Sequence, residues 1–85
     1  MRVTVLYFAR LREALQCERE VIDVPADVRT VTQLRAWLVA RGEPWSSAFG
    51  EIKRIRAAID QAMAQDTTPL HEGAEVAFFP PVTGG

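Results

Sequence analysis

The strongest constraint on the fold is the run at residues 2–8, where apolar side chains occupy both alternating positions of an extended chain. β-Branched and aromatic residues dominate it, which is typical of a strand buried on both faces, and hence of a strand inside a sheet. The chain has 85 residues, enough for one thin-cored domain with little room to enclose a substrate. We therefore expect its activity to depend on partners or exposed groups.

Two further segments predict strands. Residues 18–24 alternate, with Glu20, Ile22 and Val24 on one face, and Pro25 ends the pattern. Residues 74–79 form the last predicted strand, which the pair Pro80-Pro81 terminates. Between the first two strands, Ala9–Leu15 predicts a short helix or a turn-like connection.

The clearest helix signal begins at Thr30. Thr30 and Gln33 are spaced as a capping box, in which each side chain bonds a backbone N–H group of the other residue. Apolar residues then recur at three- and four-residue intervals, while Gly42 and Pro44 oppose continuation. The pattern predicts a helix over residues 31–41.

Residues 45–64 support two interpretations. Ile52, Ile55, Ile59 and Met63 have helical spacing, and propensity favours one long helix. The alternative breaks the segment at Gly50 and places a short helix over residues 45–49. A hairpin would then follow, with its turn at residues 60–61.

Composition excludes several classes of function. The net charge of -1 does not supply the basic field that nucleic-acid binding needs. Residues 53–56 contain the only basic run. We interpret this run as solvated surface, and the alternative is a docking patch for an acidic partner. One cysteine, Cys17, and one histidine, His71, provide neither a disulfide nor a metal site. With no apolar stretch long enough for a membrane span or a signal sequence, we expect a cytoplasmic protein.

The tail is the feature that most directly indicates chemistry. Two prolines hold the chain extended as it leaves the last strand, and Val82 and Thr83 favour the same conformation. Gly84 and Gly85 then make a tip thin enough to enter a narrow active site. A terminal carboxylate is a poor electrophile until an enzyme converts it to an acyl-adenylate. The alternative interpretation is that Gly84 and Gly85 are a frayed terminus, or residues left over from an expression vector.

The tail and two other segments of the chain resemble a known protein family. Residues 75–85 look like the C-terminal signature of the small subunits of molybdopterin synthases, which are ubiquitin-like sulfur carriers. Residues 8–13 and 57–61 are also similar to that family. The resemblance implies an α+β fold, the β-grasp, with a mixed sheet of about five strands wrapped on one main helix plus a short second helix. It also implies a domain over residues 1–79 and a reactive tail over residues 80–85.

The resemblance decides between the two interpretations of residues 45–64, because residues 56–60 and Ala62–Ala64 match the strands of a hairpin. It also implies a cycle. An adenylating enzyme related to the ubiquitin activators uses ATP on Gly85, and a sulfur donor protein converts the adenylate to a thiocarboxylate. The large synthase subunit, in a heterotetramer, then uses the sulfur for the dithiolene of molybdopterin. No bound cofactor, metal, nucleic acid or membrane is implied for this chain.

Several site residues follow by position. Gly85, with Gly84, carries the chemistry at the end of the tail. Phe8, Met63 and Phe79 match an apolar patch used against both enzymes, although each could instead belong to the core. Arg12 could pair with a partner acid or with an acid of its own domain. Alternatives for the whole chain are a sulfur carrier for thiamine or tRNA thiolation, a protein modifier, or an interaction module with an inert tail.

Overall fold

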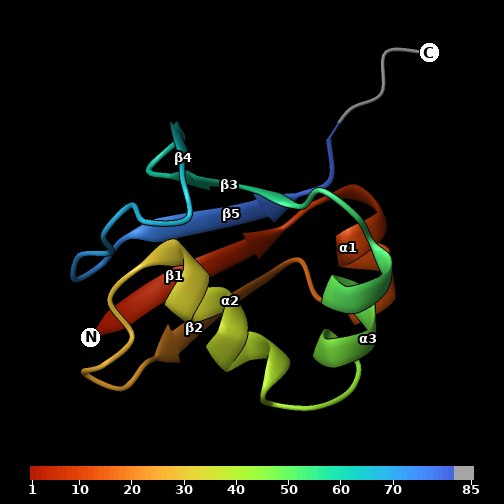
Figure 1. Ribbon diagram of the computed structural model, residues 1–85, viewed down its shortest axis with the longest axis horizontal. Coiled ribbons are helices and arrows are strands. Elements are labelled where there is room, and N and C mark those ends of the chain that lie inside the picture. Colours follow the sequence, from red (N-terminus) through yellow and green to blue (C-terminus); the bar gives the residue numbers. More distant parts are fainter. Residues whose placement is uncertain (82–85) are drawn as a thin grey trace.

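The computed structural model describes residues 1–81, which form three helices and five strands (Figure 1). In chain order these are β1 (Arg2–Tyr7), α1 (Ala9–Leu15), β2 (Arg19–Asp23), α2 (Val31–Val39), α3 (Trp45–Glu51), β3 (Arg56–Ile59), β4 (Ala62–Ala64) and β5 (Glu75–Phe79).

The strands form one mixed sheet in the order β2-β1-β5-β3-β4. β1 and β5 pair in parallel, and the other neighbours are antiparallel. The first and last strands of the chain therefore lie side by side within the sheet. As a result, β1 ends, β5 ends and β3 begins at the same end of the molecule, which is where the tail departs (Figure 1).

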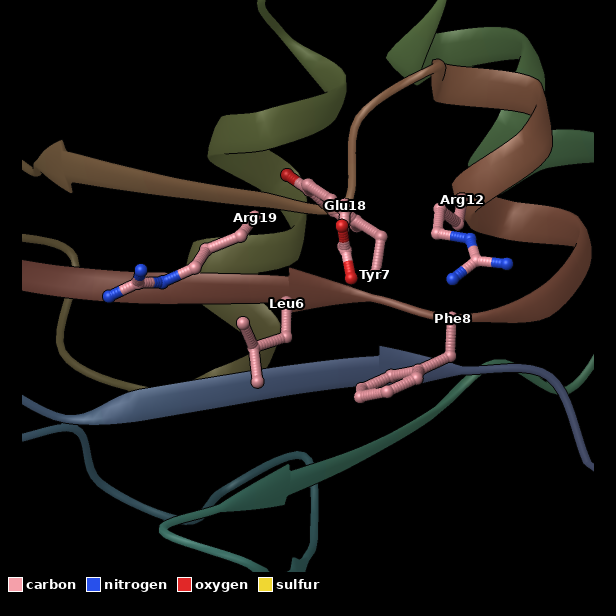
Figure 2. Close-up of a pocket in the computed structure, with 6 residues that line it drawn as sticks. All are labelled: Leu6, Tyr7, Phe8, Arg12, Glu18 and Arg19. Carbon is pink, nitrogen blue, oxygen red and sulfur yellow. The ribbon is translucent and has the colours of Figure 1, made fainter.

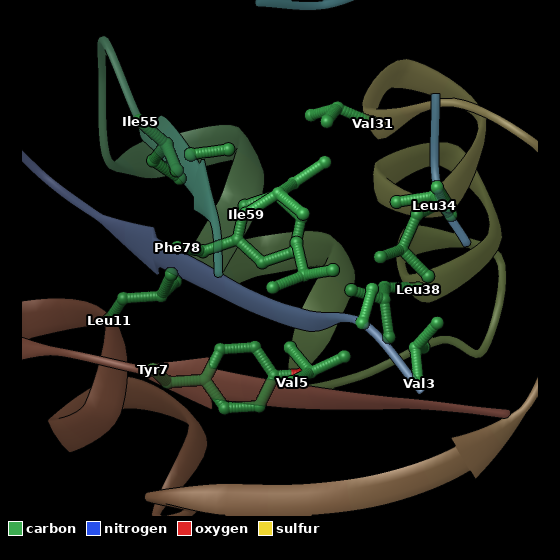
Figure 3. Packing of buried hydrophobic residues seen from close by; sticks show 14 of the residues in the cluster. Val3, Val5, Tyr7, Leu11, Val31, Leu34, Leu38, Ile55, Ile59 and Phe78 are labelled. Atoms are coloured by element: carbon green, nitrogen blue, oxygen red, sulfur yellow. The ribbon is translucent and has the colours of Figure 1, made fainter. Parts of the chain in front are cut away.

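β1 is an interior strand, as predicted, but the expectation that both of its faces are buried is wrong. Val3, Val5 and Tyr7 are buried, whereas Leu6 on the opposite face is only half-buried. Among the described residues, the large buried cluster lies on one side of the sheet, where Leu34 and Leu38 of α2 meet Val3 and Val5 (Figure 3). The other face of the sheet therefore carries apolar residues, such as Leu6, that do not belong to this core.

The main helix has the predicted start. The Thr30 hydroxyl accepts a hydrogen bond from the Gln33 backbone, and the Gln33 side chain accepts one from the Thr30 backbone. The helix ends at Val39, two residues earlier than predicted, and Gly42 adopts a positive φ of 97°. Only glycine adopts this conformation without strain, and Gly42 thus allows the chain to turn between α2 and α3.

The long helix favoured by propensity over residues 45–64 is wrong, and the hairpin implied by the family resemblance is right. α3 runs through Gly50 to Glu51, so Gly50 does not break it as the alternative supposed. Asp60 and Gln61 both have positive φ, the geometry of a tight hairpin turn between β3 and β4. Pairing of β3 with β5 satisfies backbone groups along the strand, and this outweighs helix propensity of ~0.5 kcal/mol per residue.

Candidate docking face and tail base

The sheet face turned away from α2 carries a row of small and apolar side chains. The strand register aligns Leu6 on β1 with Ala77 on β5, Ala77 with Ala58 on β3, and Ala58 with Met63 on β4. Met63, at the end of this row, has 62% of its surface exposed. A methionine exposed on a sheet is an adaptable apolar contact for a partner.

A second row lies next to the tail. β5 sets Phe79 opposite Arg56 of β3, and the hydrogen bond from the Phe8 backbone N–H to the Phe78 carbonyl brings Phe8 beside the end of β5. Phe8 is 44% exposed and Phe79 is half-buried, whereas Phe78 is fully buried. We call the surface formed by Leu6, Phe8, Ala58, Met63, Ala77 and Phe79 the docking face.

The three apolar residues predicted for an interface thus lie on one face of the sheet. Phe8 and Met63 are exposed, so neither belongs to the core. Phe79 faces away from the core because β5 alternates, with Val76 and Phe78 inside. Their use against a partner remains a prediction, although the shared face is what such a use requires.

An open pocket of about 280 Å³ borders the docking face at β1 and β2 (Figure 2). Leu6 and Phe8 supply its apolar part, and Arg12, Glu18 and Arg19 supply charged groups around it. Arg12 projects from α1 above Phe8 in Figure 2. Within residues 1–81 Arg12 makes no ion pair, so the predicted pairing with an acid of its own domain is not found there.

Pro80 and Pro81 follow β5 directly and lie outside any strand. They are half-buried at the edge of the docking face, next to Phe79. The predicted reactive residues Gly84 and Gly85, and the extended residues Val82 and Thr83, lie outside the described residues.

Sequence reasoning missed a polar cluster that ties β1, β2 and α3 together. The Tyr7 hydroxyl donates to Glu20 at 2.7 Å and accepts from the Trp45 indole at 3.1 Å. Arg41 bonds both oxygens of Glu20 at 3.1 Å and lies 4.1 Å from the centre of the Trp45 ring. Burial, helped by the hydrogen bond to Glu20, raises the pKa of Tyr7 far above its ordinary value of 10.0. These residues are too far apart in sequence for a motif to reveal them.

A second missed contact joins the β3–β4 turn to the loop before β5. His71 Nε2 lies 2.6 Å from Asp60 Oδ2, and His71 Nδ1 lies 3.0 Å from the Glu72 carbonyl oxygen. Both ring nitrogens therefore face acceptors, which suits the protonated imidazolium. The hydrogen bond to Asp60 raises the pKa of His71, while the bond from the Glu75 backbone lowers the pKa of Asp60.

The remaining reactive side chain is Cys17. Burial raises the pKa of its thiol, and the Glu20 carboxylate adds to the rise, so the nucleophilic thiolate is disfavoured. In the part of the chain that the structure describes, no three His, Cys, Asp or Glu side chains are grouped as a metal site. The same residues include no helix long and apolar enough to cross a membrane.

Comparison with known proteins identifies the family of this chain. A family model described as the ThiS family matches residues 5–85, nearly the whole chain. The chain belongs to the ThiS family. One curated member, the molybdopterin synthase sulfur carrier subunit of Escherichia coli (strain K12), is 41% identical over 83 residues, which cover 98% of this chain and 99% of that protein. The family resemblance read from the tail is therefore confirmed.

Two solved structures resemble this chain in fold. The protein–protein complex of subunits 1 and 2 of molybdopterin-converting factor from Helicobacter pylori 26695 contains a chain that matches with a TM-score of 0.69 and 26% identity, covering 100% of both chains. SAMP1 from Haloferax volcanii matches with a TM-score of 0.78 over 100% of both chains, at 24% identity. This ThiS-family chain therefore has the predicted ubiquitin-like β-grasp fold.

Proposed function

We propose that this chain is the sulfur carrier subunit of a molybdopterin synthase, with the carboxylate of Gly85 as the group that carries sulfur. The observation that supports this most is the full-length likeness to a curated sulfur carrier subunit at 41% identity. The family match also extends through Gly84 and Gly85. The position of the docking face next to Pro80 and Pro81 supports the proposal that a partner binds there and accepts the tail.

The proposed cycle begins with activation. An oxygen of the Gly85 carboxylate attacks the α-phosphorus of ATP in an adenylating enzyme related to the ubiquitin activators, and pyrophosphate leaves. The terminal sulfur of a persulfide on a donor protein then attacks the acyl carbon and displaces AMP, which gives an acyl disulfide. A thiol cleaves this S–S bond, forms a disulfide with the donor cysteine and releases the thiocarboxylate. ATP is consumed by the partner, and this chain itself needs no bound cofactor. Because these steps use cytosolic ATP, a cytoplasmic location fits the proposal.

The second half of the cycle takes place on the large synthase subunit, in a heterotetramer of two small and two large chains. The tail enters the active site of the large subunit, and the thiocarboxylate sulfur bonds a side-chain carbon of a cyclic pyranopterin monophosphate and displaces an oxygen substituent from it. An oxygen from water replaces the sulfur at Gly85. Since a dithiolene holds two sulfur atoms, two carriers are discharged for each molybdopterin. The carrier must therefore dissociate easily, which suits a modest apolar face.

Mass spectrometry tests this proposal. The chain is incubated with the adenylating enzyme, ATP and a sulfur source, and the intact mass is measured. We expect an increase equal to the difference between one sulfur and one oxygen atom, located at Gly85 by fragmentation. An unchanged mass would instead support an interaction module with an inert tail, while attachment of Gly85 to lysines of other proteins would support a protein modifier.

A further inference from the structure

The charges of this protein are divided between the two ends of the sheet. Around the tail base lie five basic side chains, on α1, between α3 and β3, and at the first position of β3: Arg10, Arg12, Lys53, Arg54 and Arg56. The same end holds three acidic ones, namely Glu13, Glu18 and Glu51. The guanidinium of Arg19 points away from Phe8, toward the other end of β1 (Figure 2).

The opposite end has the reverse balance. Six acidic residues lie there: Asp23, Asp27, Asp60, Asp66, Glu72 and Glu75. Arg2, Arg29, His71 and the Met1 amino group are its cations. The net charge of -1 thus conceals a separation of charge along the strands.

The basic groups at the tail base are not engaged within the described part of the domain. The ion pairs recorded among residues 1–81 belong to Arg2, Arg41 and His71, none of which lies at the tail base. Lys53, Arg54 and Arg56 are all exposed, and Arg56 stands opposite Phe79 of the docking face. Their positive charge is therefore directed toward whatever approaches the tail.

We propose that this basic rim recognises carboxylates on the surface of a partner protein, beside the channel that accepts the anionic tail. The inference rests on the proposed function and adds the chemistry of the partner surface. Apolar contacts with Phe8, Met63 and Phe79 provide adhesion, while the basic rim steers the tail end, rather than the acidic far end, toward the channel. Such charge complementarity acts mainly on the association rate and on orientation.

A nucleic acid is the other polyanion that a basic rim could attract. The far end argues against it, because six acidic side chains would repel an extended phosphate backbone. The apolar residues within the rim also include two phenylalanines beside a row of small side chains, which favours a protein surface. A protein partner with acidic groups around an apolar centre matches both features.

The experiment compares two charge reversals of equal size. The variant Lys53→Glu/Arg54→Glu alters the rim without touching the docking face, and neither side chain makes a hydrogen bond or ion pair within residues 1–81. The control Arg2→Glu/Arg29→Glu makes the same change in net charge at the far end. Association with the large synthase subunit is followed by stopped-flow fluorescence at low and high salt, after circular dichroism has verified folding.

We expect the rim variant to associate about tenfold more slowly than the control at low salt, and the difference to vanish near 1 M salt, where the Debye length is ~3 Å. Equal association rates for the two variants would overturn this inference but leave the sulfur-carrier proposal intact. Failure of the unaltered chain to bind the large subunit would overturn both. Binding of a fluorescent single-stranded oligonucleotide, lost in the rim variant only, would assign the rim to nucleic acid instead.

Discussion

At the scale of single residues, Phe78 and Phe79 show how one strand serves two purposes. Phe78 is fully buried and meets Phe49 edge-on, with ring centres 5.4 Å apart. Phe79 points to the opposite face and lies between Phe8 and Arg56. Because successive side chains of a strand alternate, a single step along the chain passes from the core to the docking face.

This contrast leads to a prediction for Phe79→Asp. Loss of the ring and a new charge at the docking face should weaken binding to the large synthase subunit by roughly 30-fold, as for other hot-spot residues. The free energy of unfolding should fall by less than about 1 kcal/mol, since the ring lies outside the core. Isothermal titration calorimetry and urea unfolding measure the two quantities.

Val21→Asp is the matched control, because Val21 is 56% exposed on the same outer face but lies on the edge strand β2, opposite Thr4 and away from the tail base. It should bind normally. If Phe79→Asp instead unfolds the domain while binding per folded molecule is unchanged, the ring is part of the core and the docking face is wrongly assigned.

The contact between Asp60 and His71 predicts a dependence on pH. The pKa of His71 is raised above 6.5, so its contribution to stability is fully present below pH 6.5 and is lost as the pH rises through the native pKa. The pKa of Asp60 is lowered below 3.8, so its contribution is present above pH 3.8 and is lost as the pH falls through the native pKa. Both contributions are therefore complete only between pH 3.8 and pH 6.5, and the turn is most stable in that window.

An NMR titration of the His71 ring measures this effect. We expect a pKa above 6.5 that moves back toward 6.5 in Asp60→Asn, which keeps an acceptor for the Glu75 backbone but removes the charge. Asp66→Asn, which alters an exposed carboxyl outside the pair, should leave the titration unchanged. The pairing would be refuted by a His71 pKa that is the same in all three proteins.

At the scale of elements, the sequence predicted the helix and strands whose signals are local. The Thr30 capping box, the alternation in β2 and the two prolines after β5 placed their elements within two residues, because each signal lies within or beside one element. Local signals did not predict the structure of residues 52–64. Ile52, Ile55 and Ile59 are all buried, but they reach the core from a turn, a loop and a strand. Only pairing with β5, 16 residues or more away, distinguishes this arrangement from a helix.

The polar cluster around Tyr7 was likewise invisible in the sequence, and it predicts a cost for Tyr7→Phe. The substitution keeps the buried ring but leaves the Trp45 indole N–H and one bond of Glu20 without a partner. We expect a loss of about 1–2 kcal/mol in the free energy of unfolding. Urea denaturation measures it through the midpoint, with the slope unchanged.

Thr4→Val serves as the control, because Thr4 lies on the same strand and its hydroxyl makes no recorded side-chain bond within residues 1–81. Its effect should stay within about 0.5 kcal/mol. A Tyr7→Phe protein as stable as the original would show that the cluster does not join β1 to α3 energetically.

At the scale of the whole molecule, the fold separates stability from function. The core between α2 and the inner face of the sheet holds the domain together, and the outer face and basic rim surround the point where the tail leaves. Placing β5 inside the sheet, parallel to β1, anchors the base of the tail firmly. A chain of this size can therefore take part in chemistry whose pocket belongs to other proteins.

This separation predicts the effect of altering the tail alone. Deletion of Gly85, or addition of one residue after it, should abolish thiocarboxylate formation, because the activated carbonyl would be misplaced in the adenylating enzyme. The urea midpoint should not change, since no core residue is affected. Normal sulfur loading of an extended and untrimmed chain would contradict the role of Gly85.

Delivery of the Gly85 sulfur to a pterin dithiolene can be followed in a single-turnover assay. Chain bearing a Gly85 thiocarboxylate is mixed with the large synthase subunit and cyclic pyranopterin monophosphate, and sulfur on the carrier and in the product is counted. We expect two carriers to return to the carboxylate form for each molybdopterin made. Carriers that keep their sulfur beside the bound large subunit, with no dithiolene formed, would contradict this expectation.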